Sequence, residues 1–208
     1  MKYVTTIVLN WLSSPAAVWH YRRIWLDALA LTLVATASVW LISNANGLSA
    51  FQIFDENAPH EMLQSVFLGL AVVLAAIAAW RAEPFGRYLA ISIALICYIF
   101  LFRETPVCKD EIVSLCTSRP PRVLSIAGAA VALLICTVFY EFRHRGIVLK
   151  ALHPALSWPL AVTAFALFGS QVMEHLHFMA VEETLELYAY AVLLLASLWF
   201  ARHSSHYR

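Results

Sequence analysis

Charged residues are scarce in this 208-residue chain, because Asp, Glu, Lys and Arg together make up only 13% of it. A soluble domain carries roughly twice that share. The basic residues occur singly or in pairs and the formal net charge is +1, so no extended positive field is available to attract nucleic acid. Nucleic-acid binding is therefore excluded. No Gly/Ser linker or low-complexity tract divides the chain, which predicts a single domain over residues 1–208.

The sequence also lacks the short motifs that identify common chemistries. It contains no HExxH zinc motif, EF-hand loop, P-loop or GxSxG nucleophile elbow. No reaction can be assigned from a motif. Any function has to be argued from the placement of individual polar residues.

Long apolar runs dominate what is present. Hydrophobic residues form 62% of the chain, and its mean hydropathy is +0.73. A span across hydrocarbon needs roughly 20 apolar residues, and its backbone must satisfy its own hydrogen bonds, which favours helices. The sequence predicts an all-α, polytopic integral membrane protein with a bundle of six transmembrane helices, at about residues 24–43, 61–80, 87–102, 123–142, 156–173 and 183–201.

The first residues form a separate, shorter pattern. Apolar side chains between Tyr3 and Leu12 recur at helical spacing and are followed by Ser13, Ser14 and Pro15. This pattern predicts a short N-terminal helix lying in the membrane interface. A signal peptide is the alternative interpretation of the same residues.

The distribution of lysine and arginine predicts the orientation. With the N-terminus inside, ten of the 14 basic residues lie on the inner side and four on the outer side. The positive-inside rule then predicts a multi-pass protein of the inner (plasma) membrane, in contact with the lipid bilayer, with both termini in the cytoplasm. The outward segments are residues 44–60, 103–122 and 174–182.

The four cysteines divide between a loop and the spans. Cys108 and Cys116 lie in the middle outward segment, where an oxidising compartment allows them to pair, and we expect a disulfide between them. Cys97 and Cys136 lie inside apolar runs and are expected to be packing residues.

Polar residues gather where four of the six predicted helices reach the outer face. Acids at helix starts and bases at helix ends match the helix dipole. Glu104 and Glu174, however, sit at helix ends, where a carboxylate needs a cationic partner, and Glu186 lies one turn inside its span. We therefore predict a binding cavity at the outer mouth of the bundle, lined by Glu61, Gln64, Arg103, Glu104, Glu174, Glu182, Glu183 and Glu186.

Three functions remain open at this point. The first is binding or translocation of a cation, a proton or a small polar solute, with Glu186 as a titratable gate. The second is a metal-dependent hydrolase or transferase acting on a lipid, in which Glu186, Glu183 or Glu104 is catalytic and a divalent ion such as Zn²⁺ is held by His60, His175, His177 and Glu174. The third is a non-catalytic membrane subunit or assembly partner, and the oligomeric state is not predicted.

Overall fold

A computed structural model describes residues 23–47, 53, 59–105 and 117–203. Within these ranges the regular structure is helical, as predicted, and six helices are long and apolar enough to cross a membrane. They are α2 (Ile24–Ala45), α4 (Pro59–Arg81), α5 (Pro84–Glu104), α6 (Arg119–Arg143), α8 (Pro154–His175) and α9 (Met179–His203). The predicted interfacial helix, Cys108 and Cys116 lie outside the described residues. Cys97 and Cys136 are free thiols.

The helices extend beyond the predicted spans at their polar ends. The third prediction, residues 87–102, becomes the 21-residue α5, which starts at Pro84 and continues to Glu104. Proline is tolerated in a first helical turn because its missing N–H has no partner there anyway, and α8 likewise begins at Pro154. Hydropathy identifies the apolar middle of a helix. It does not identify the polar turns at the ends, where the helical hydrogen bonds continue.

A short helix, α7 (Ile147–Ala151), was not predicted. It follows Gly146, whose φ of 83° lies in the left-handed region that glycine adopts without strain. The carboxylate of Glu141 accepts hydrogen bonds from the backbone N–H groups of Gly146 and Val148 at 2.7 and 3.0 Å. These bonds fix the connection between α6 and α8.

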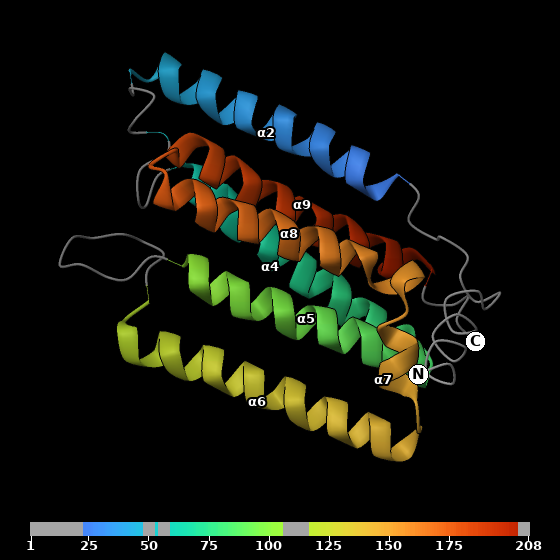
Figure 1. The fold of residues 1–208 in the computed structure, drawn as a ribbon. Helices are drawn as coiled ribbons and strands as arrows, with labels where there is room; N and C mark the ends of the chain where they lie inside the picture. Colours follow the sequence, from blue (N-terminus) through green and yellow to red (C-terminus); the bar gives the residue numbers. More distant parts are fainter. Residues whose placement is uncertain (1–22, 48–52, 54–58, 106–116, 204–208) are drawn as a thin grey trace, which may run out of the picture.

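The last helix, α9, forms the centre of the bundle. It packs against α2, α4 and α8, and Figure 1 shows it within the stack of helices while α2 and α6 lie at opposite margins. Its apolar window is 56% buried, against 6% for that of α6. The core is built around α9 residues that include Leu187, Tyr190, Val192 and Leu193.

Small side chains allow α4 to approach its neighbours closely. Ala71, Ala75 and Ala78 are almost fully buried, at the surface that α4 shares with α5 and α9. Lipid tails are as apolar as the side chains of a membrane helix, so such helices associate by close packing rather than by the hydrophobic effect. By contrast, α6 contacts α5 through one face and leaves most of its apolar side chains exposed.

Candidate functional site

Polar residues from distant parts of the sequence meet at one end of the bundle. Neighbouring helices run in opposite directions there, so the start of α4, the end of α5, the end of α8 and the start of α9 lie at the same end (Figure 1). We call the buried and half-buried polar side chains that connect at this end the polar network: Thr36, His60, Gln64, Arg103, Glu104, Ser170, Glu183, Glu186 and Tyr190.

Arg103 is the cationic centre of the first half of the network. Its Nη2 atom donates to Glu186 Oε1 at 2.8 Å, and its Nε atom lies 3.3 Å from Glu104 Oε1. Glu104 also accepts from the hydroxyl of Tyr190 at 2.7 Å, and Ser170 Oγ lies 3.2 Å from Glu186 Oε1. One guanidinium therefore bridges carboxylates of α5 and α9.

Gln64 and Glu183 form the second half. Gln64 Nε2 donates to Glu183 Oε2 at 2.7 Å and lies 3.2 Å from the backbone oxygen of the same residue. Because both neighbours are acceptors, they fix which end of the amide carries the nitrogen. His60 Nδ1 lies 3.4 Å from Glu183 Oε2, and His60 Nε2 lies 3.4 Å from Thr36 Oγ1. This half joins α2, α4 and α9.

The other end of the Gln64 amide is an unused acceptor. Gln64 is fully buried, and its Oε1 atom has no hydrogen-bond partner among the residues the structure describes. A buried acceptor without a partner costs roughly 1–3 kcal/mol. This oxygen is an acceptor that a hydrogen-bond donor or a cation could use.

The helix α6 also contacts the network, through a side chain that bonds the backbone of Arg103. Arg122, near the start of α6, donates from Nη2 to the carbonyl oxygen of Arg103. The contact brings a second guanidinium to this end of the bundle. Each of the six long helices described thus contributes at least one group to the network or to its border.

The predicted cavity residues separate into three sets. Gln64, Arg103, Glu104, Glu183 and Glu186 are brought together, and the cationic partner expected for Glu104 is Arg103. Glu61 and Glu182 are half-buried at the border. Glu174 is exposed at the end of α8 and forms no ion pair with any described residue, so its expected cationic partner is not found.

The predicted metal site is not found among the described residues, where no group of three or more His, Cys, Asp or Glu side chains is placed to hold a metal ion. His60 is buried against Glu183, whereas His175, His177 and Glu174 are exposed. The predicted Zn²⁺ ligand set is thus divided between the interior and the surface.

The two exposed histidines belong to a tight helix-to-helix turn. His177 has φ 60°, the backbone N–H of Phe178 donates to Met173 O at 3.0 Å, and the N–H of His177 donates to Glu174 O at 3.0 Å. These two bonds form a Schellman motif, which closes the end of α8. The turn places the start of α9 against the end of α8, and so positions Glu183 and Glu186.

Three members of the network were not predicted from the sequence. Ser170 and Tyr190 contact the buried carboxylates, and Thr36 contacts His60. Tyr190 lies four residues after Glu186, on the same helical face, and this spacing was an available signal. Thr36 and Ser170 carry no such signal, because hydroxyl side chains commonly bond their own helix backbone.

Comparison of the chain with protein-family models, curated proteins and solved structures gives no match. The contacts at this end of the bundle therefore have to carry the functional argument.

Proposed function

We propose that this protein is a multi-pass protein of the inner membrane that binds a proton, a small cation or a small cationic solute in the polar network, which faces outward. Both termini lie in the cytoplasm under this proposal, because the side with more lysine and arginine is retained inside. The observation that carries the proposal is the excess of buried and half-buried carboxylates over guanidinium groups at this end.

The charge balance favours uptake of positive charge. Glu104 and Glu186 share Arg103, while Glu183 contacts an amide and an imidazole. A carboxylate away from water is costly unless it is paired, protonated or bound to a cation. Counting Arg122 as a second guanidinium still leaves one carboxylate in excess.

The unused oxygen of Gln64 gives the site a second ligand atom. It belongs to the side chain whose Nε2 atom donates to Glu183, and it is the acceptor of that amide that has no partner. Oxygen atoms of this kind suit a hard cation or an ammonium-like donor better than an anion. The chemical class we propose is therefore cationic.

Binding is better supported than free passage. Below the network, α4 and α9 pack through apolar side chains that include Leu68, Ala71 and Leu193, all of which are buried. The buried carboxylates, Glu104 and Glu186, both lie at the network end of the bundle. Translocation would require the helices to move apart, whereas binding requires only the arrangement described.

A stability measurement tests the site. A ligand that binds only the folded state raises its stability by about 2.7 kcal/mol at 100 times its Kd. We expect the unfolding midpoint of the detergent-purified protein to rise with either mildly acidic pH or one of a panel of cations, namely Na⁺, K⁺, Ca²⁺ and methylammonium. Glu183→Gln should remove that dependence, because it removes the carboxylate beside Gln64.

Glu174→Gln is the matched control, since Glu174 is exposed at the same end of the bundle and forms no ion pair within the described residues. It should retain the dependence in full. If acidic pH or the cation stabilises wild type and Glu183→Gln equally, or stabilises neither, the network holds the helices together and does not bind positive charge. Loss of pH-dependent cation flux into vesicles on Glu186→Gln, with folding intact, would extend the function to transport.

A further inference from the structure

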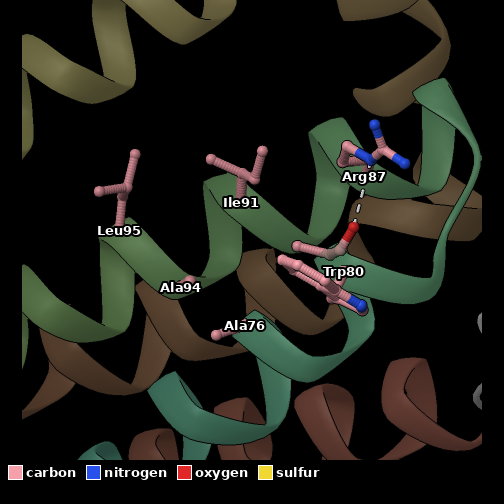
Figure 2. A pocket seen from close by; sticks show the side chains of 7 residues that line it. Ala76, Trp80, Arg87, Ile91, Ala94 and Leu95 are labelled. Atoms are coloured by element: carbon pink, nitrogen blue, oxygen red, sulfur yellow. Dashed lines mark hydrogen bonds between the residues drawn. The ribbon is translucent and has the colours of Figure 1, made fainter.

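A groove between α4 and α5 lies near the opposite end of these two helices from the polar network. It encloses about 580 Å³ and is lined by Ala76, Ala79, Trp80, Arg87, Ile91, Ala94 and Leu95. This volume falls within the range of small-molecule sites. The alanines leave the space, because larger side chains at these positions would fill the gap between the two helices (Figure 2).

Arg87 is the charged residue of the groove, and no described carboxylate forms an ion pair with it. Its Nε atom donates to the carbonyl oxygen of Ala79 at 3.2 Å, close to the end of α4, where the helix dipole favours a cation. This bond fixes the guanidinium, and Figure 2 shows its two terminal nitrogens directed away from that carbonyl. They are placed to bind an anion.

Trp80 stands next to Arg87 at the mouth of the groove (Figure 2). It is 88% exposed, which is unusual for so large an apolar side chain in a soluble protein but typical of the headgroup level of a membrane. Its indole N–H is a donor that can bond a phosphate or ester oxygen. The groove therefore combines an apolar floor with two donors at one end.

We propose that this groove binds one anionic phospholipid, with an acyl chain along the alanines and the phosphate at Arg87 and Trp80. The inference requires the six helices to span a bilayer, but it does not depend on what the polar network binds. Charge and location agree, because basic pockets between transmembrane helices on the cytoplasmic side favour anionic headgroups. The basic residues Arg81 and Lys150 are exposed at the same end of the bundle and add positive charge there.

Native mass spectrometry of the detergent-purified protein tests the site, with phosphatidylglycerol and phosphatidylcholine as probes at equal concentration. We expect one phosphatidylglycerol to be retained in preference to phosphatidylcholine. Arg87→Gln should reduce the phosphatidylglycerol affinity about fivefold, the effect of one basic side chain near a headgroup. Ala76→Phe, which fills the groove from an exposed position, should reduce retention of both lipids.

Two controls carry the same chemical changes elsewhere. Arg143→Gln removes an exposed charge from the end of α6, and Ala132→Phe enlarges an exposed alanine of α6. Both should retain wild-type lipid binding. Equal retention of the two lipids by wild type, an unchanged affinity in Arg87→Gln, or displacement of the lipid by inorganic phosphate at the same concentration would overturn the inference.

Discussion

Glu186 and Arg103 show how a buried charge pair is tolerated at the edge of an apolar bundle. Glu186 is 4% exposed, yet its Oε1 atom accepts hydrogen bonds from Arg103 and Ser170, so its charge is paired. A buried pair of this kind contributes little net stability when intact, whereas removing one partner leaves the other uncompensated. The effect of the pair on the free energy of unfolding is therefore large only when one partner is removed.

Glu186→Gln should lower the free energy of unfolding by about 1–3 kcal/mol, because a neutral amide replaces a carboxylate opposite Arg103. Glu186→Leu should cost more, approaching roughly 3–5 kcal/mol. The side chain of Arg103 is 39% exposed and keeps Glu104, which moderates both losses. Denaturant unfolding in micelles measures them. A neutral or stabilising effect of Glu186→Leu would show that the pair has no structural value.

His177 occupies a conformation better suited to glycine. Its φ of 60° is left-handed, which costs an L-residue roughly 1–2 kcal/mol, and glycine is the usual residue at this position of a Schellman motif. We predict that His177→Gly stabilises the protein by about 1 kcal/mol.

The neighbouring histidine provides the control for that prediction. His175 is the last residue of α8, in a right-handed conformation, so His175→Gly should be destabilising by about 1 kcal/mol. Thermal unfolding of both variants compares them directly. Destabilisation by His177→Gly would mean that its imidazole makes a contact worth more than the backbone strain.

At the scale of helices, α9 and α6 represent two extremes of burial. The central helix contacts α2, α4 and α8 and carries several side chains with no exposed surface, while α6 packs mainly against α5 (Figure 1). In lipid, an exposed apolar side chain costs nothing, so α6 needs no second protein layer. The loss of stability on substituting a residue should therefore depend on whether that residue contacts protein, and not on how hydrophobic it is.

Ala191 of α9 and Ala132 of α6 form a matched pair for this test, because one is fully buried and the other exposed. Ala191→Leu should cost about 1–3 kcal/mol, since the added methyl groups have no space. Ala132→Leu should remain within about 0.5 kcal/mol of wild type. Unfolding midpoints in detergent measure both changes. Similar effects at the two positions would place a second protein surface against α6.

How much the sequence predicts differs between the helices and their contacts. The six spans follow from apolar length, but Pro84 and Glu104 extend α5 because hydrogen bonding continues past the apolar run. The helix dipole predicted that Glu104 needs a cationic partner, and the structure supplies Arg103. The pairing of Gln64 with Glu183 was not predicted, because it depends on how α4 and α9 are rotated about their axes. The predicted metal ligands are not brought together in the described residues, because the turn between α8 and α9 keeps His175 and His177 on the surface while His60 is buried.

For the whole molecule, the even number of long helices places Arg23 and His203 at the same end of the bundle. Together with the lysine and arginine bias, this predicts that both lie on the cytoplasmic side. Alkaline phosphatase fused after residue 203 should therefore be inactive, whereas fusion after residue 46, between α2 and α4, should give an active enzyme. The opposite pattern would place the polar network on the cytoplasmic face.

Infrared difference spectroscopy of the carboxyl groups is the most direct measurement of whether the polar network takes up positive charge. We predict that lowering the pH, or adding the cation that stabilises the protein, changes the carboxyl bands of wild type, and that Glu183→Gln, Glu186→Gln or both lose part of this change. Glu174→Gln should lose none of the signal that belongs to the buried groups. Identical difference spectra in wild type, Glu183→Gln and Glu186→Gln would contradict a charge-binding site at this end of the bundle.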